Sequence, residues 1–259
     1  MCLPSGVHDC TDAGPYLVGD LWQFTPNAAG NGGTWTWYPT PSKQYYAGGC
    51  LPGVVGAATL GGRVGASYWT DANGSVWVFG GLGFGASNTA TCQTVGSSPV
   101  SGYLNDLWKY TNGQWTLVAG PATLNQPGSY GKQGVAAGTN LPPPRFHAAA
   151  WQDLRGNFRM FGGAKGPYGN SLSAYNDLWE FVYNTKTWIW IGGSQGAVQV
   201  GANHVGPGPG PRAGAAGGAI GFADFSVYGG LGENATAPGP FPNPLNDFWQ
   251  GVGVVYDWP

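Results

Sequence analysis

The chain has 259 residues, of which 8% are charged, and its formal net charge is −2. Ten basic residues give no electrostatic footprint for nucleic acid, and no apolar run approaches the ~18 residues of a transmembrane helix. The 48 glycines and 21 prolines interrupt most ten-residue windows, which excludes a helical protein. The 13 tryptophans, 13 tyrosines and 11 phenylalanines can bury a core, which a disordered chain lacks.

The chain opens with residues 1–16, which we expect to form a loop segment. This stretch has neither the basic nor the apolar region of a signal peptide. The low charge, the abundance of Gly, Asn, Thr and Trp, and an even number of cysteines nevertheless indicate an exported protein. We therefore expect an extracellular or cell-surface location, with a signal already removed or with a sequence that starts inside a longer chain.

Two sequence blocks recur along the chain, and such repeats indicate a repeat architecture. The first block begins with an arginine and reaches a double glycine 17 residues later; it occurs at Arg63 to Gly80-Gly81, Arg145 to Gly162-Gly163, and Arg212 to Gly229-Gly230. The second block is Asp-Leu-Trp or Asp-Phe-Trp; it begins at Asp20, Asp106, Asp177 and Asp247. Another aromatic residue follows each of the last three aspartates after 9 to 11 residues.

Each pair of blocks predicts four short strands, which we call a to d. The arginine block is two strands around a turn such as Asp71-Ala-Asn-Gly74. The aspartate block opens strand c, and the later aromatic lies on strand d. In chain order the sequence then predicts a c–d half blade and three four-stranded blades, at residues 17–38, 63–118, 145–192 and 212–258.

The double glycine after an aliphatic-aromatic strand, followed by a variable loop, Asn-Asp-Leu-Trp and a further Trp, resembles kelch repeats. The likeness is to the long, Trp-rich kelch type of secreted and cell-surface proteins related to the galactose-oxidase central domain, and it covers residues 17–258. The resemblance implies an all-β, kelch-type β-propeller. It says little of function, because propellers serve many.

Three and a half blades are fewer than the six or seven with which kelch-like propellers usually close. Residues 1–16 hold no arginine block and cannot supply the missing a and b strands. We expect the remaining strands from a longer polypeptide, which makes this chain part of a larger ring. Association with another chain is the second interpretation, and a distorted four-blade ring is the third.

Most recurrent polar residues have a structural interpretation. Asp20, Asp106, Asp177 and Asp247 can cap turns before strand c, and buried pairing with Arg63, Arg145 and Arg212 is a further use. The double glycines, Gly80, Gly81, Gly162, Gly163, Gly229 and Gly230, let strand b pass close to a neighbouring backbone. The recurrent tryptophans are expected to pack between blades rather than to form a ligand cage.

Function is expected in the loops, because every long connection, b–c or d–a, leaves the same face of a propeller. This long-loop face carries scattered aromatic residues that suit stacking on sugars: Tyr45, Tyr46, Phe84, Tyr103, Tyr130, Tyr168 and Phe241. Rings that merely pin their own loops are the alternative. We expect a non-catalytic binding module for a glycan or a protein, or else a structural subunit of an extracellular assembly or filament.

The four cysteines fall on the same predicted face. Sequence order favours disulfides Cys2–Cys10 and Cys50–Cys92 among the three pairings that four cysteines allow. Two N-glycosylation sequons begin at Asn73 and Asn234.

An enzyme is the most distant interpretation. The galactose-oxidase resemblance implies a copper centre of two His, two Tyr and a Tyr–Cys crosslink. The three histidines, His8, His147 and His204, show no ligand spacing. His147 is notable only because Gly65 and Gly214 occupy its position in the other repeats. We expect no catalytic residues, cofactor or metal.

Overall fold

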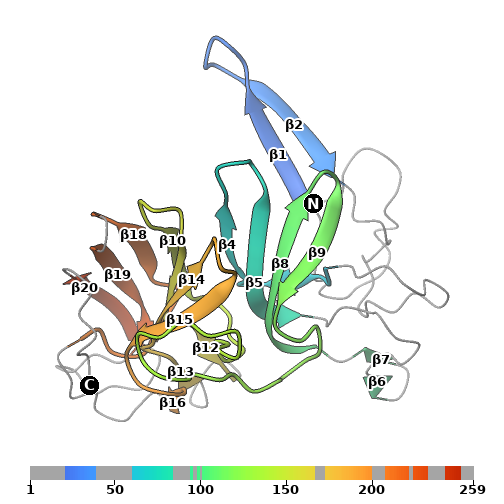
Figure 1. Ribbon diagram of the computed structural model, residues 1–259. Coiled ribbons are helices and arrows are strands. Elements are labelled where there is room, and N and C mark those ends of the chain that lie inside the picture. The colour runs from blue at the N-terminus through green and yellow to red at the C-terminus, as the bar shows by residue number, and fades with distance from the viewer. Residues whose placement is uncertain are drawn as a thin grey trace.

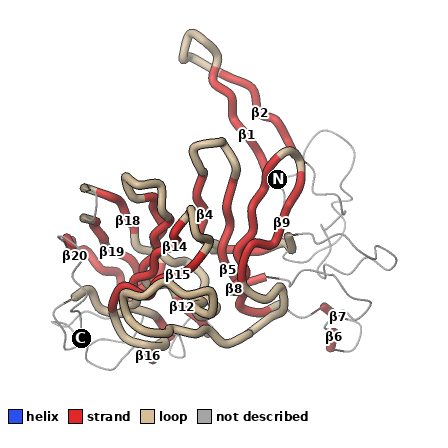
Figure 2. Tube along the Cα trace, viewed as in Figure 1, coloured by secondary structure: helices blue, strands red, loops and turns tan. Residues whose placement is uncertain are grey.

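A computed structural model describes residues 21–38, 60–83, 94–95, 98–99, 101–166, 173–199, 208–221, 224–232 and 243–251. Within these residues the chain forms antiparallel sheets joined by turns and loops, without a helix (Figure 2). None of the described residues forms a helix able to cross a membrane. The prediction of an all-β protein is confirmed.

The first element is a two-stranded hairpin of β1 (Leu21–Pro26) and β2 (Gly33–Tyr38). Side chains alternate between the two faces of a strand, so the hairpin gathers four large rings on one face, while Tyr38 lies on the other face and packs against Tyr110. The rings pair across the strands, Trp22 with Trp37 and Phe24 with Trp35. The hairpin coincides with the predicted c–d half blade; Asp20 lies outside the described residues.

The first full sheet has the order β4-β5-β8-β9, with β3 also paired to β5. Its strands are β3 (Arg63–Val64), β4 (Ser67–Thr70), β5 (Val76–Gly83), β8 (Gly102–Thr111) and β9 (Gln114–Ala119). The Asp71 carboxylate closes the a–b turn by accepting from the N–H groups of Asn73 and Ser75, at 3.0 and 2.9 Å. At the c–d turn Asn112 and Gly113 both have positive φ, as a two-residue hairpin requires.

The second and third full sheets follow the same order. The second is β10 (Ala149–Gln152), β11 (Phe158–Phe161), β14 (Leu178–Val182) and β15 (Thr187–Gly192). The third is β17 (Arg212–Ala213), β18 (Ala216–Ala219), β19 (Phe225–Gly232) and β20 (Asn243–Gly251). Its predicted strand d, near residue 256, lies outside the described residues.

Short strands also form within the long connections, where we expected only loops. β6 (Thr94–Val95) pairs with β7 (Ser98–Pro99). A three-stranded ladder joins β12 (Ala164–Lys165), β13 (Ser173–Ala174) and β16 (Val198–Gln199). This ladder connects a b–c loop to a d–a loop, so the two loops are held together by backbone hydrogen bonds.

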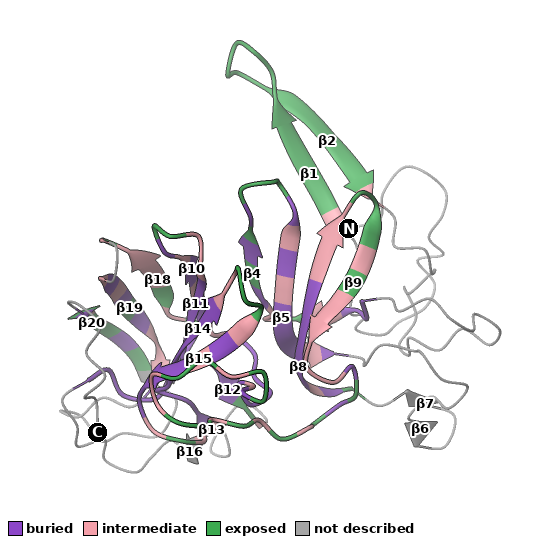
Figure 3. Cartoon of the chain, in the orientation of Figure 1, coloured by how far each residue is buried: buried purple, intermediate pink, exposed green. Residues whose placement is uncertain are grey.

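The full sheets pack face to face, and their first strands β4, β10 and β18 lie side by side (Figure 1). One aromatic core lies between the first and second sheets and a second core between the second and third (Figure 3). The first includes Trp77, Trp179 and Trp188, which are at most 1% exposed. Each such ring removes about 150–250 Å² from water, which at about 25 cal/mol/Å² contributes several kcal/mol before entropy.

The double glycines interlock one sheet with the next. The Gly81 N–H donates to the Arg145 carbonyl at 2.8 Å, and the Arg145 N–H donates to the Leu104 carbonyl at 3.2 Å. A Cβ at Gly80, where φ is +67°, would lie 2.8 Å from the same arginine carbonyl. Two glycines are needed because both the φ angles and this close approach exclude a side chain. The Gly162-Gly163 pair repeats the arrangement with the backbone of Arg212.

Candidate functional site

Each described arginine–aspartate pair is an internal structural unit. The Arg145 guanidinium binds both carboxylate oxygens of Asp177, at 2.5 and 2.8 Å, and donates to the Gly162 carbonyl at 2.8 Å. The Trp179 indole N–H donates to the same carboxylate at 2.8 Å. Because every charge is neutralised within the unit, these groups are not available to a ligand.

The same unit is built from the corresponding residues of the other two repeats. Arg63 binds Asp106 at 2.7 and 3.0 Å, and Arg212 binds Asp247 at 2.7 and 2.8 Å. The indole N–H groups of Trp108 and Trp249 each donate to the aspartate of their own unit at 2.6 Å. The carboxylate–arginine pairing that the repeats indicate is therefore present in all three described repeats.

The two ends of the sheets differ, and the difference locates the candidate site. At one end, the turn face, short turns at residues 71–75, 112–113, 153–157 and 183–186 join the strands. At the other end, the long-loop face, the connection 120–148 and the described segments 162–166 and 173–177 leave the sheets (Figure 1). Binding residues concentrate in such loops when a rigid scaffold holds them.

Residues 120–148 form a tightly pinned loop over this end. The Tyr130 hydroxyl donates to Asp177 at 2.7 Å and accepts from the Gly196 N–H at 2.7 Å. Its ring packs 5.0 Å from Trp179. Burial, reinforced by the Asp177 charge, raises the pKa of Tyr130 well above its usual value. Tyr130 therefore anchors its own loop, as the alternative interpretation of the loop aromatics proposed.

Buried amide side chains hold the rest of the loop. The Asn140 amide donates to the carbonyls of Val135 and Trp188, at 2.8 and 2.9 Å. The Asn105 amide donates to the Pro142 carbonyl at 3.2 Å. The bonds to Trp188 and from Asn105 tie the loop to β15 and β8, so the loop is a preformed surface.

Three neighbouring rings, Tyr103, Phe146 and His147, form what we call the rim. They lie where strands a and c meet the long-loop face. Phe146 is buried and lies 5.7 Å from Tyr103 and 5.0 Å from His147, while the outer two rings are half-buried. Phe146 and Tyr103 belong to a small apolar core that joins the first sheet, the β12–β13 ladder and β17 of the third sheet. Of the two predicted loop aromatics within the described ranges, Tyr130 is used as an anchor, and Tyr103 is the half-buried ring that lies in the rim.

His147 has an unusual backbone for a residue with a side chain. Its φ is +55°, close to the +66° and +69° of Gly65 and Gly214 at the same repeat position. Its N–H donates to the Gly65 carbonyl at 2.6 Å, and its carbonyl accepts from the Gly214 N–H at 2.7 Å. Burial lowers the pKa of His147, which keeps the imidazole neutral at pH 7. A side chain in this left-handed position costs energy that glycine avoids, which marks His147 as a functional candidate.

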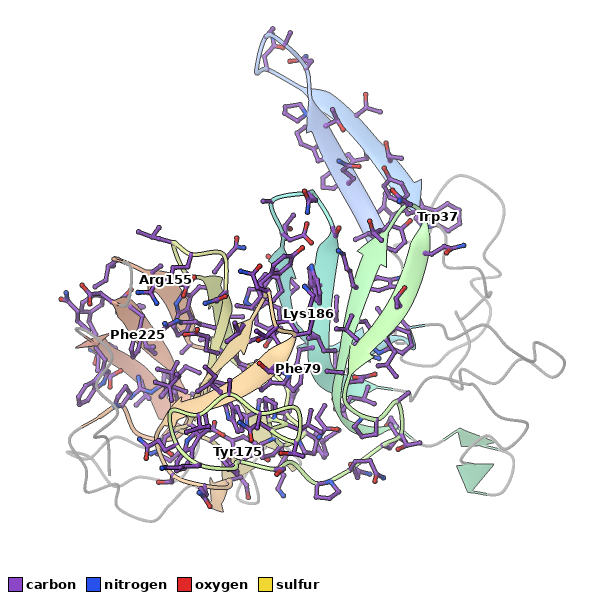
Figure 4. All side chains as sticks on the ribbon, viewed as in Figure 1. Trp37, Phe79, Arg155, Tyr175, Lys186 and Phe225 are labelled. Atoms are coloured by element: carbon purple, nitrogen blue, oxygen red, sulfur yellow. The ribbon has the colours of Figure 1, made fainter. Side chains whose placement is uncertain are left out.

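Deeper on the same face, Tyr175 is committed to the scaffold (Figure 4). Its hydroxyl donates to the Pro144 carbonyl at 3.2 Å, and its ring lies 4.1 Å from the Arg145 guanidinium carbon. Burial raises the pKa of Tyr175 to about 12.

A polar cluster on the turn face was not expected from the sequence. Asp71 of the first sheet accepts from Tyr183 of the second at 3.0 Å, and Lys109 lies 3.4 Å away. Lys186 lies over the Tyr183 ring at 3.5 Å, nearer the turns than Phe79 (Figure 4). Burial alone would raise the pKa of the Asp71 carboxyl, but hydrogen bonds, from Trp77 above all, hold it well below its usual range. The cluster ties two sheets together, and the 112 residues between Asp71 and Tyr183 hide it from sequence patterns.

Another acidic residue without an expected role is Glu180. It binds Arg159 at 2.6 Å and accepts from the Asn157 amide at 2.9 Å. Among the described residues, no three His, Cys, Asp or Glu side chains lie close enough together to hold a metal ion. His147 is also the single histidine in the described ranges, so the described donors do not fit a mononuclear copper centre.

Several predicted residues lie outside the described ranges. They are the cysteines Cys2, Cys10, Cys50 and Cys92, the sequon Asn234, and the loop aromatics Tyr45, Tyr46, Phe84, Tyr168 and Phe241. His8 and His204 lie outside them as well. The other sequon residue, Asn73, is exposed in the first a–b turn.

The chain matches no protein-family model and no curated protein. Among solved structures, it is similar to the structure of YjhT, with 16% sequence identity and a TM-score of 0.37. The match covers 70% of this chain and 38% of that chain, so this chain spans well under half the length of YjhT.

Proposed function

We propose that the chain is a segment of a kelch-type β-propeller that binds a glycan or protein ligand outside the cell, through its long-loop face. Three features support the propeller interpretation. The full sheets share one antiparallel strand order, their first strands lie side by side, and the same arginine–glycine interlock joins successive sheets. The ring would take further strands from the same or another chain.

The observation that carries the binding proposal is His147. The two glycines at its position show that the fold itself does not need a side chain there, and φ of +55° makes one costly. The half-buried Tyr103 and His147 rings both neighbour the buried Phe146 ring. A partly open group of rings of this kind suits a ligand with an apolar face, such as a sugar.

A catalytic role has less support. The carboxylates of Asp106, Asp177, Asp247 and Glu180 are all engaged with arginine.

A glycan array followed by calorimetric titration tests the proposal. The variant His147→Gly restores the glycine of the other repeats, so it should fold normally yet weaken binding about tenfold, as expected for the loss of one ring contact with the ligand. Leu154→Ser, an exposed change on the turn face, is the control and should bind like the wild type. Binding that His147→Gly leaves unchanged, or no saturable binding to any glycan or protein, would contradict the proposal.

The second candidate function is a structural subunit of an extracellular assembly. It is favoured by the hairpin β1–β2, which is exposed along most of both strands (Figure 3). The four large rings on one of its faces are at least 40% exposed. Exposed contiguous apolar side chains of this kind mark interaction surfaces.

A further inference from the structure

Two sheet faces, one near each end of the row of sheets, carry large exposed apolar side chains. The head face is the ring-bearing face of the hairpin: Trp22, Phe24, Trp35 and Trp37, which are 40%, 44%, 63% and 40% exposed. The tail face is the outer face of the third full sheet, where Tyr228 and Phe248 pair across β19 and β20 and are 52% and 62% exposed.

The repeat shows what normally happens to the tail face. Tyr228 lies 16 residues after its repeat arginine, and Phe248 directly follows the repeat aspartate. The residues at these positions in the other full sheets are at most 3% exposed: Phe79, Leu107, Phe161 and Leu178. In both sheets the next sheet along the chain covers them. The tail face is therefore the same surface without its cover.

The head face also has a buried counterpart. Its cross-strand pairs, Trp22 with Trp37 and Phe24 with Trp35, match two pairs in β14 and β15. Those pairs are Trp179 with Trp190 and Phe181 with Trp188, and all four residues are at most 8% exposed. The hairpin thus presents, uncovered, the ring set that the second full sheet buries.

Inside the chain these two kinds of face pack on each other. Phe79 and Leu107 of the first sheet share one core with the ring set of the second. Phe79 lies 5.2 Å from Trp188, edge to face. The head and tail faces are consequently the two halves of a contact that the chain already makes.

We propose that the tail face of one copy of this chain binds the head face of a second copy. Tyr228 would lie against the partner's Trp35, as Phe79 lies against Trp188, and Phe248 would take the place of Leu107. At the repeat positions where the first sheet has Trp69 and Trp77, the third sheet has the small residues Gly218 and Ser226. The large side chains that the tail face offers to a partner are therefore Tyr228 and Phe248. In the structure the hairpin and β20 lie at opposite ends of the row of sheets (Figure 1).

Such a contact is heterologous, because each copy uses a different face for each neighbour. It leaves one head and one tail exposed, so it continues into a filament or closes into a ring. The inference rests on the second candidate function, assembly, and not on a ligand at the rim.

Complementary variants of the 259-residue chain test the proposal by sedimentation velocity. The tail variant carries Tyr228→Ser and Phe248→Ser, and the head variant carries Phe24→Ser and Trp35→Ser. The control, Tyr68→Ser, removes a ring that is 72% exposed but belongs to neither face.

Wild type and control should associate increasingly as concentration rises. For each double variant alone, the dissociation constant of self-association should be about 30-fold higher than for the wild type, or more, as expected for loss of central aromatic contacts. A one-to-one mixture should form a dimer and nothing larger, because the intact head of one variant fits the intact tail of the other. This dimer also shows that both variants fold.

A wild type that stays monomeric at every concentration would overturn the proposal. This holds whether the head and tail faces remain exposed or bind each other within one molecule. Double variants that assemble like the wild type, or a mixture that fails to dimerise, would overturn it as well. Glycan binding measured on the same variants keeps the two proposals separate, since neither face contains a rim residue.

Discussion

The arginine–aspartate units of the second and third full sheets have nearly the same bonds but different covers. Arg145 and Arg212 each bind two carboxylate oxygens and the carbonyl of the first residue of the double glycine, Gly162 or Gly229. The Asp177 side chain is fully buried, with Tyr130 donating to it from the loop, whereas the Asp247 side chain is 37% exposed. The repeat motif therefore sets the geometry of the arginine–aspartate pair. The neighbouring segments set how deeply the pair is buried, and so how much stability is lost when one partner is removed.

The largest effect is expected from Asp177→Ala, which should lower the free energy of unfolding by about 3–5 kcal/mol. The change leaves the Arg145 guanidinium buried without its carboxylate and removes the acceptor of Trp179 and Tyr130. Urea denaturation at low protein concentration measures it, with Leu154→Ser as an exposed control. A loss below about 1 kcal/mol, the range of surface pairs, would contradict the importance of the cover.

The next comparison uses the double glycines. Gly162→Ala should cost about 2–4 kcal/mol, because a Cβ at φ of +67° would lie 2.6 Å from the Arg212 carbonyl. Gly229→Ala should cost about 1–2 kcal/mol, since the nearest carbonyl is 3.0 Å from the added Cβ and needs to shift less, which leaves the left-handed φ of +62° as the main cost. Equal losses in urea denaturation would show that the interlock with the next sheet adds nothing.

Asp247→Ala should cost less than Asp177→Ala, about 1–2 kcal/mol after allowance for solvent screening. Although burial raises the pKa of Asp247, hydrogen bonds from Arg212 and Trp249 lower it below the ordinary 3.8. Its contribution is therefore complete above pH 3.8 and is lost as the pH falls through the lower folded value. Below pH 4, the free energy of unfolding should fall less steeply with decreasing pH for the variant than for the wild type. An equal pH dependence in the two proteins would contradict this role of Asp247.

The smallest effect is expected from His147→Gly, which should change the free energy of unfolding at pH 7 by less than about 1 kcal/mol. Because burial lowers the pKa of His147 below 6.5, the wild type should lose stability as the pH falls from 6.5 toward the folded value. The variant lacks this contribution. Chemical denaturation at pH 7.5 and 5.5 checks it, and an identical pH dependence in both proteins would argue against a buried, neutral imidazole.

The sequence predicted the strands well because the repeats mark them with residues that have fixed roles. The turn from Asp71 to Gly74 and the arginine–aspartate pairs follow directly from residue type and spacing. The splitting of strand a into β3 and β4 was not predicted, since it depends on the left-handed φ of Gly65. A glycine in a sequence does not reveal which φ it adopts.

The candidate site was harder to predict because it depends on contacts between distant residues. Tyr130 was predicted as a ligand-face ring, but its hydroxyl bonds to Asp177, 47 residues away. Glu180 carried no repeat signal and pairs with Arg159 across neighbouring strands. His147 occupies a repeat position that is glycine in the other repeats, at Gly65 and Gly214. This difference is the feature of the sequence that indicates the rim.

The contact that is buried between the first and second sheets has its two halves exposed on the tail face and the head face. Hydroxyl-radical footprinting of Trp35 and Trp188 tests it most directly, because the two rings share a position but are 63% and 1% exposed. At high dilution Trp35 should be oxidised much faster than Trp188, and its reactivity should fall toward that of Trp188 as concentration rises. A Trp35 that is protected at high dilution, or that stays reactive in concentrated solution, would contradict the account.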